Sequence, residues 1–216
     1  MYSIVDFDTL GGDVIPRGIN DHDDVVGTTR LSPSVGGFHA FLYLRSCGCI
    51  HDLALTQAEL SDARAVSDSD IVTMDSTQEI DDPDDPAIIW NGDNRAPLPG
   101  TNANNNQWAS ANAMNTAGLI AGDASTAAAM SHATLWTAIA TGYVATDLGT
   151  LGGMFSHAAA INAAGDVAGT SDTDIPNSNC DIAGLGIDRT HAFLYKSGVL
   201  QDLGTLSTII DNSEAT

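Results

Sequence analysis

The sequence predicts an all-β protein, a β-propeller-like array of four-stranded repeats. Three observations lead to this prediction. A sequence pattern recurs about every 47 residues along the 216-residue chain. Each repeat contains short strand-like runs separated by turn residues, and no window has the period of a capped helix. The acidic residues are nearly all aspartate, which favours turns over helices.

The first recurring pattern is an apolar residue followed by asparagine, a short turn and a small apolar strand ending in glycine. It occurs at Asn20, Asn115 and Asn162, with a weaker copy at Ser67. These four positions are separated by 47, 48 and 47 residues. Such regular spacing is typical of structural repeats, so each copy is expected to occupy the same place in its own repeat.

Two further patterns follow in a fixed order. His-Ala-Phe-Leu-Tyr occurs at 39–43 and 191–195 and returns in altered form at 132–136, whereas the second repeat has Pro86 in place of the histidine. An Asp-Leu-Gly pattern, clearest at 147–153, then closes the repeat. We therefore expect one repeat domain over 1–216, with repeats at about 11–58, 59–106, 107–153 and 154–206 and partial repeats at 1–10 and 207–216.

In combination, the His39-Ala40-Phe41 and Asp147-Leu148-Gly149 motifs resemble those of the bacterial extracellular repeat family named HAF, after its His-Ala-Phe triplet. The resemblance covers essentially the whole chain. It implies a secreted or cell-surface protein, and it carries no general activity with it.

Each repeat divides into four strand candidates. In the last repeat they are expected at 156–161, 166–170, 191–195 and 199–203. Four strands in one such repeat match a propeller blade, whose sheet is buried on both faces. The continuous apolar run from Ala40 to Tyr43 fits that burial. A β-solenoid is the alternative, although its coils are usually shorter. Because both chain ends resemble partial repeats, we expect a larger ring or a fragment of one.

The charge of the chain excludes some partners. The sequence has 28 acidic and 7 basic residues, a formal net charge of −21. Such a charge repels nucleic acid and anionic membrane surfaces, whereas it attracts cations. The excess of aspartate beside a single lysine, Lys196, is also typical of proteins adapted to saline surroundings. No stretch approaches the roughly 20 apolar residues of a membrane-spanning helix, so we expect no membrane insertion.

The polar residues that recur most regularly are histidines and asparagines at equivalent repeat positions: His39, His132, His191, Asn20, Asn115 and Asn162. The histidines could converge on a channel and hold a metal. A structural histidine that hydrogen-bonds a loop in each repeat is the preferred interpretation, because Pro86 replaces it in the second repeat.

Aspartate-rich turns could bind calcium, which takes six to eight oxygen ligands. The best candidates are expected in the longer loops between second and third strands: Asp81, Asp82, Asp84, Asp85, Asp172 and Asp174. None of these clusters reproduces the complete EF-hand pattern, and solvated turn acids account for most of them. Calcium is the only cofactor that the sequence suggests.

The chain has three cysteines. Cys47 and Cys49 are separated by one residue, which we interpret as too close for an easy disulfide with each other. Either of them could pair with Cys180. Three cysteines without a fourth ligand make a poor zinc site.

No catalytic motif of the G-x-S-x-G, H-E-x-x-H or Walker type is present in the sequence. The leading hypothesis is therefore a non-enzymatic scaffold or recognition module whose rim loops bind a glycan or a surface protein. An insertion of about ten residues before His191 would protrude from that rim. Two alternatives stay open: a secreted polysaccharide hydrolase with aspartates at the channel mouth, and a structural repeat stabilised by calcium.

Overall fold

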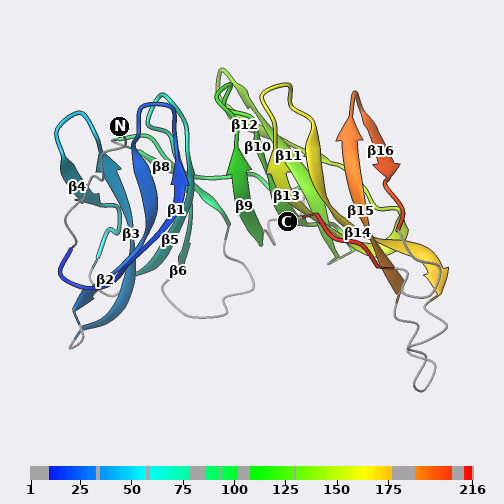
Figure 1. Ribbon diagram of the computed structural model, residues 1–216, viewed down its shortest axis with the longest axis horizontal. Helices are drawn as coiled ribbons and strands as arrows, with labels where there is room; N and C mark the ends of the chain where they lie inside the picture. Colours follow the sequence, from blue (N-terminus) through cyan, green and yellow to red (C-terminus); the bar gives the residue numbers. More distant parts are fainter. Residues whose placement is uncertain are drawn as a thin grey trace, which may run out of the picture. The chain divides into compact units, whose positions relative to one another are not determined.

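The computed structural model describes residues 10–32, 35–56, 59–77, 86–92, 94–101, 108–128, 130–176, 188–205 and 212–215. Its sixteen strands form four sheets of four strands each, and the described residues contain no helix, so none that could cross a membrane (Figure 1). The all-β prediction and its four-stranded repeats are confirmed. The chain divides into two compact units, Met1–Pro97 and Leu98–Thr216.

The first unit contains two antiparallel meanders, in which strands consecutive in sequence are neighbours in the sheet. The first sheet comprises β1 (Val14–Ile19), β2 (Val25–Ser32), β3 (Val35–Leu44) and β4 (Cys49–Asp52). The second comprises β5 (Leu60–Val66), β6 (Val72–Thr77), β7 (Ile88–Trp90) and β8 (Arg95–Pro97).

The second unit repeats this topology in two further meanders. One comprises β9 (Ala109–Met114), β10 (Ile120–Ser125), β11 (Ser131–Ile139) and β12 (Gly142–Asp147). The other comprises β13 (Gly152–Ile161), β14 (Val167–Pro176), β15 (Asp188–Lys196) and β16 (Val199–Asp202). All pairings between the named strands are antiparallel, unlike the parallel coils typical of a β-solenoid.

Within each unit the two sheets pack against each other through the first strand of the second sheet. β5 packs against β1, β2 and β3, and β13 packs against β9, β10 and β11. The core of the first unit is built from both of its sheets and contains Val26, Ala40, Leu42, Leu53, Ala63, Val66, Val72 and Met74. In the second unit it contains Ala121, Ala133, Leu148, Ala158, Val167 and Phe193.

The third strand of the first sheet is buried on both faces, as its sequence predicts. The side chains from Ala40 to Tyr43 are between 0% and 4% exposed although successive residues of a strand point to opposite faces. Stability therefore depends on packing between neighbouring sheets, as is usual for repeat proteins.

A β-bulge occurs at the same position in the first strand of every sheet. In the first sheet, Pro16 pairs with Gly27 and Gly18 pairs with Val26, so Arg17 is the extra residue. The corresponding extra residues of the other sheets are Arg64, Asn112 and Ala159. Since a bulge kinks its strand and changes the direction of a side chain, it places three polar residues at equivalent points.

The repeated asparagines organise the turn between the first and second strands. Asn115 Oδ1 accepts hydrogen bonds from the amides of Ala117 and Leu119, at 3.1 and 3.0 Å. Its Nδ2 donates to the carbonyl of Asn162, the equivalent residue of the next repeat, at 2.9 Å. One side chain therefore shapes its own turn and ties it to the next sheet of its unit.

The first unit uses the same device. Asn20 Nδ2 donates to the Ser67 carbonyl at 3.0 Å, and Ser67 Oγ accepts from amides within its own turn. The fourth residue of each turn has a positive φ, and in the first two repeats it is Asp23 (φ 62°) and Asp70 (φ 58°). Aspartate tolerates this conformation better than most residues, so local turn geometry explains part of the aspartate-rich composition.

Candidate functional site

The repeated histidines pair with the aspartate of the Asp-Leu-Gly motif in their own repeat. In each of three sheets the histidine Nδ1 lies 2.9 Å from a carboxylate oxygen, in the pairs His39–Asp52, His132–Asp147 and His191–Asp202. The aspartate also accepts an amide two residues further on, from Gly149 at 2.8 Å in the third sheet. Each histidine thus joins the third strand to the end of the fourth strand within its own sheet.

A serine from the following repeat completes this junction. The amide after each histidine donates to a serine Oγ at 2.8–2.9 Å, in the pairs Ala40–Ser61, Ala133–Ser156 and Ala192–Ser213. Serine, histidine and aspartate therefore meet in a composition that resembles a hydrolase triad. However, His39 Nε2 is buried without a hydrogen-bond partner among the described residues, whereas a triad histidine must reach the serine hydroxyl. His191 Nε2 is buried in the same way, so at these two histidines the geometry is that of a structural contact.

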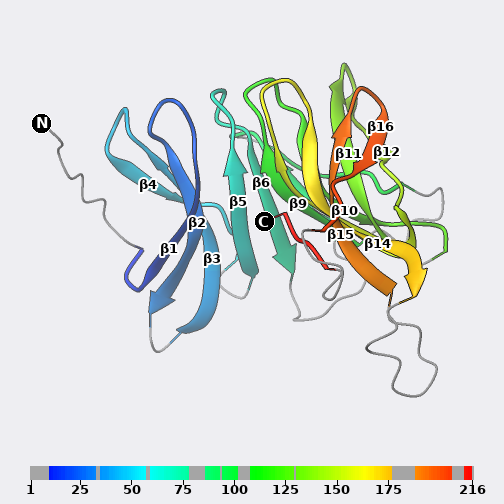
Figure 2. The same cartoon turned by 45° about the vertical axis from the view of Figure 1, so that its right-hand side comes forward.

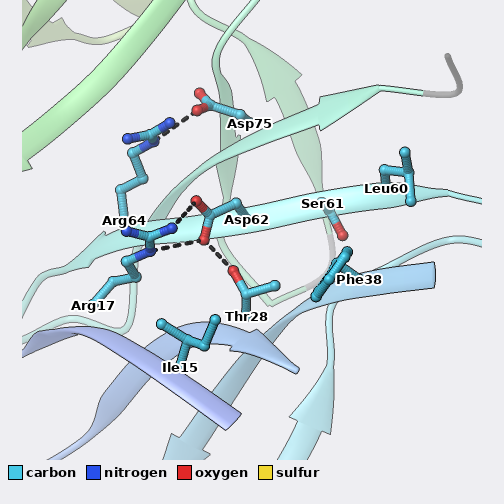
Figure 3. Close-up of a pocket in the computed structure, with 9 residues that line it drawn as sticks. All are labelled: Ile15, Arg17, Thr28, Phe38, Leu60, Ser61, Asp62, Arg64 and Asp75. Carbon is cyan, nitrogen blue, oxygen red and sulfur yellow. Dashed lines mark hydrogen bonds and ion pairs between the residues drawn. The ribbon is translucent and has the colours of Figure 1, made fainter. Parts of the chain in front are cut away.

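A groove of about 440 Å³ lies between the two sheets of the first unit (Figure 3). This volume falls within the range of small-ligand pockets. Its lining comes from strands β1, β2, β3, β5 and β6 and consists of Ile15, Arg17, Thr28, Phe38, Leu60, Ser61, Asp62, Arg64 and Asp75. We call it the junction groove, because it is formed where one repeat meets the next.

Two ion pairs form the polar side of the junction groove. Arg17 contacts the Asp62 carboxylate with two nitrogens, at 3.3 Å from Nε to Oδ1 and 3.1 Å from Nη2 to Oδ2. The Thr28 hydroxyl donates to the same carboxylate (Figure 3). Arg64 Nε lies 2.6 Å from Asp75 Oδ2. Both arginines are the bulge residues of their strands, so the backbone irregularity positions these charges.

The junction groove is also lined by accessible apolar side chains. Ile15 is 47% exposed and Phe38 is 41% exposed, although both are large hydrophobic residues. The Arg30 guanidinium lies 4.9 Å from the centre of the Phe38 ring, a cation–π contact that restrains the ring. Exposed apolar side chains beside ordered polar groups are typical of binding surfaces.

A smaller groove of about 170 Å³ occupies the equivalent place in the second unit, where His157 replaces Asp62. Beside it lies Asp123, a carboxylate that is only 3% exposed. Asp123 accepts the Ala158 amide at 2.9 Å, Asn112 Nδ2 at 3.1 Å and His157 Nδ1. In the first unit the carboxylate between the two repeats is Asp62, which comes from the later repeat. In the second unit it is Asp123, which comes from the earlier repeat.

Among the described residues, the calcium candidates do not form a cluster of carboxylates that could hold an ion. Asp172 and Asp174 lie in strand β14 and not in a loop, so the prediction of their location was wrong: β14 and its pairing partner continue past the point where the sequence suggested a turn. Asp172 accepts hydrogen bonds from the Phe155 amide and the Thr190 hydroxyl, at 3.2 and 3.4 Å. Asp81, Asp82, Asp84 and Asp85 lie outside the described residues.

The structure joins Cys47 and Cys49 in a disulfide, so the prediction that they are too close to pair was wrong. The β3–β4 turn is the physical reason, because Gly48 adopts a positive φ of 64° and the two Cα atoms are 5.2 Å apart. His51 Nε2 lies 3.4 Å from Cys49 Sγ, and sequence reasoning missed this histidine. Its spacing, Cys-x-Cys-x-His, was the available signal. Cys180 lies outside the described residues.

A buried ion pair stabilises the second sheet, which lacks the histidine–aspartate pair. Arg95 holds Glu59 with two hydrogen bonds of 2.6 and 3.1 Å. Burial alone would raise the pKa of Glu59, but the hydrogen bonds from Arg95, Ser76 and the Leu55 amide outweigh it, and the pKa lies below the usual 4.5. Glu59 therefore stays ionised in the folded protein as the pH falls.

We expect Glu59→Gln to remove much of the acid sensitivity of the first unit. The pKa of Glu59 is lower in the folded chain than in the unfolded chain. The ionised carboxylate therefore stabilises the folded state fully at pH values above the unfolded pKa of about 4.5, and this stabilisation is lost as the pH falls through the lower pKa of the folded chain. Urea unfolding at about pH 7 and about pH 3 measures this difference.

At neutral pH the Glu59→Gln variant should lose about 3 kcal/mol of unfolding free energy, because Arg95 keeps a buried charge without its partner. The exposed Glu214→Gln is the control, and an unchanged pH dependence in Glu59→Gln would contradict the assignment.

Two aspartates show opposite pKa shifts for different reasons. Burial raises the pKa of Asp70, and the neighbouring charge of Asp24 adds to the effect. Burial also acts on Asp202, but hydrogen bonds from His191 and the Gly204 amide dominate and lower its pKa. Asp202 is thus held as an anion that pairs with its histidine, which is consistent with a structural role.

Comparison of the chain with protein-family models, curated proteins and solved structures finds no match. Its function must therefore be inferred from its own residues.

Proposed function

We propose that this chain is a non-enzymatic recognition module that binds a neutral glycan in the junction groove. The observation that carries the proposal is that one groove is lined both by two exposed apolar side chains, Ile15 and Phe38, and by two arginine–carboxylate pairs.

The chemistry of a sugar matches both the apolar and the polar residues that line this groove. A pyranose ring has an apolar face of C–H groups, which packs on an aromatic ring such as Phe38. Its hydroxyls both donate and accept hydrogen bonds, so a guanidinium and a carboxylate held side by side can each engage a neighbouring hydroxyl. Arg17 with Asp62 provides such a pair, fixed by a bulge before any ligand arrives. A neutral ligand also avoids the repulsion that a formal net charge of −21 imposes on anions.

We further propose that the four sheets are blades of a β-propeller in an extracellular protein. The four-stranded antiparallel meanders, and the face-to-face packing of the sheets within each unit, support the blade assignment. The resemblance to the HAF repeat family supports an extracellular location. The disulfide Cys47–Cys49 does so as well, because disulfides persist mainly in oxidising compartments. The insertion at 177–187 lies outside the described residues, so the groove replaces the rim loops as the proposed site.

A polysaccharide hydrolase is the weaker candidate for the same groove. Glycoside hydrolysis requires one carboxyl that gives a proton and a second that acts as base or nucleophile. Asp62 and Asp75 are both engaged by arginines, at 3.1 and 2.6 Å. That arrangement is suited to holding a polar ligand and leaves neither carboxylate free to approach a reacting bond.

Calorimetric titration with neutral oligosaccharides of glucose, mannose and N-acetylglucosamine tests the glycan proposal. We expect one of these sugars to bind, and expect Phe38→Ala and Asp62→Asn each to weaken the affinity by about tenfold or more, through lost ring packing and a lost acceptor.

Two variants of the second unit are matched controls. Val144→Ala removes a similarly exposed apolar side chain, and Lys196→Ala removes a cation that is ion-paired to Asp166 at 2.8 Å. Both should bind as the unmodified chain does. Equal binding by the groove variants would place the site elsewhere. Release of reducing sugar that disappears in Asp62→Asn would replace the recognition module with the hydrolase.

A further inference from the structure

We propose that Cys47, Cys49 and His51 form a copper(I) site on the β3–β4 hairpin once the disulfide is reduced. These residues are the one group among the described parts of the chain in which three cysteine, histidine or acidic side chains bring their ligand atoms close enough for a metal, within 4.8 Å of one another. The hairpin is not part of the junction groove, so this site is independent of the proposed glycan binding.

The hairpin turn and the strand pairing create this arrangement. The Gly48 amide donates to the Leu44 carbonyl at 2.9 Å, which closes the turn. In the β3–β4 register Cys49 pairs with Leu44 and His51 pairs with Leu42, so Cys49 and His51 share one face of β4. The turn then returns Cys47 to the same face, and His51 Nε2 lies 3.4 Å from Cys49 Sγ.

The hairpin is accessible to an ion from solvent. β4 is an edge strand of its sheet, since only β3 pairs with it (Figure 2). Cys47 and His51 are exposed and Cys49 is half-buried. An ion can therefore reach the ligand atoms without opening the core, and the strongly acidic chain attracts cations toward its surface.

The donor set selects a soft ion of low coordination number. Thiolates favour copper(I) and zinc over hard cations such as calcium or magnesium. Zinc in structural sites takes four protein ligands, whereas two thiolates and one imidazole suffice for three-coordinate copper(I). The neighbouring carboxylate does not complete a zinc set, because Asp52 pairs with His39 at 2.9 Å on the other face of the strand.

Reduction and metal binding balance as two separate steps. A phosphine reductant gives two electrons and becomes the phosphine oxide, while one water supplies the oxide's oxygen and two protons, so the Cys47–Cys49 disulfide becomes two thiols. Copper(I) then binds both sulfurs, and each thiol releases its proton to solvent. The copper keeps its oxidation state in both steps, so loading the site needs only the reductant and the ion. Release needs a two-electron oxidant: a small-molecule disulfide takes two electrons from the copper-bound thiolates and leaves as two thiolates, the Cys47–Cys49 disulfide re-forms and copper(I) is freed, so the site is controlled by redox conditions.

A competition titration under anaerobic conditions tests the proposal on the full chain. The protein is reduced with a phosphine, freed of reductant and titrated with copper(I) held by a coloured chelator. We expect the reduced chain to take one copper(I) from the chelator, as confirmed by native mass spectrometry, and the disulfide form to take none. Cys49→Ser should abolish the uptake, and His51→Ala should weaken the affinity by about a hundredfold through loss of the third ligand.

Two control variants keep the test specific. Cys180→Ser removes the remaining cysteine and His22→Ala removes another exposed histidine, and neither should change the affinity. Equal copper(I) binding by His51→Ala would overturn the three-ligand site. Loss of binding in Cys180→Ser with retention in Cys49→Ser would place the ion elsewhere. Uptake of zinc in preference to copper(I) from an equimolar mixture would overturn the choice of metal.

Discussion

Replacement of Asp123 by threonine is expected to destabilise the second unit by about 3 kcal/mol, since a buried carboxylate with several donors is lost. Asp123 is 3% exposed and accepts hydrogen bonds from the Ala158 amide, Asn112 and His157. The shorter threonine side chain cannot satisfy all three donors. The Ala158 amide, in a residue that is 0% exposed, would then lie without its carboxylate acceptor, whereas Asn112 Nδ2 would keep the Ala158 carbonyl at 2.9 Å.

A compensating change is expected to restore much of this loss, because the first junction already carries the reciprocal arrangement. Thr28 occupies the position of Asp123, eight residues after its repeat asparagine, and Asp62 occupies the position of His157. There the threonine hydroxyl donates to the aspartate of the next repeat. Asp123→Thr combined with His157→Asp should therefore rebuild a donor–acceptor pair with the two roles exchanged.

A double-mutant cycle measures this coupling. His157→Asp alone should also destabilise, because it sets a second carboxylate against Asp123. We expect the double variant to lose less unfolding free energy than the two single variants lose together, by about 1.5 kcal/mol or more. A coupling of this size is typical of residues in direct contact. Hydrogen exchange in β9–β16, with urea unfolding, reports the second unit. Asp166→Asn with Lys196→Ala is a surface control, and strict additivity at the junction would contradict the exchange of roles.

The repeat and its strands could be predicted from the sequence alone. Both follow from a spacing of about 47 residues, which is kept even where individual residues differ between repeats. The burial of the run from Ala40 to Tyr43 could also be predicted, because four consecutive apolar residues fit a strand that is buried on both faces. The bulges could not be predicted in this way. Each first strand carries one, so the extra residue leaves the spacing between repeats unchanged and is invisible to a search for periodicity.

The junction groove also lay beyond the repeat pattern. It combines Arg17 and Asp62, which are 45 residues apart and occupy different positions of their repeats. Aligning one repeat with the next compares equivalent positions, whereas the contact joins non-equivalent ones. The reciprocal change from Thr28–Asp62 to Asp123–His157 is the signal that could have revealed it, because a carboxylate moves from one side of the junction to the other.

The cysteine prediction failed because it considered only how close Cys47 and Cys49 are in the sequence. The hairpin turn changes the direction of the chain between them, and glycine at position 48 allows the positive φ that the turn requires. The same local geometry brings His51 to the two sulfurs. A tight turn therefore creates both the disulfide and the proposed metal site.

Gly122→Ala is expected to be among the most damaging single methyl additions in the second unit, with a loss of about 4 kcal/mol or failure to fold. Gly122 pairs with Ala111 beside the bulge at Asn112. An added Cβ would overlap the Ser110 carbonyl oxygen, which belongs to the backbone of a paired strand and cannot move aside as a side chain would. The equivalent Gly27 faces the same obstacle in the Ile15 carbonyl. The bulge thus requires glycine for space and not for an unusual φ.

Gly198→Ala separates this cause from backbone strain. Gly198 has a positive φ of 81°, and nothing lies within 4 Å of its added Cβ, so the substitution should cost only about 1 kcal/mol. Urea unfolding of the two variants provides the comparison. If Gly122→Ala were no more destabilised than Gly198→Ala, the bulge would have to relax without losing its pairing. The bulges would then be adaptable features of the strands, and they could not hold Arg17 and Arg64 rigidly enough to define a binding groove.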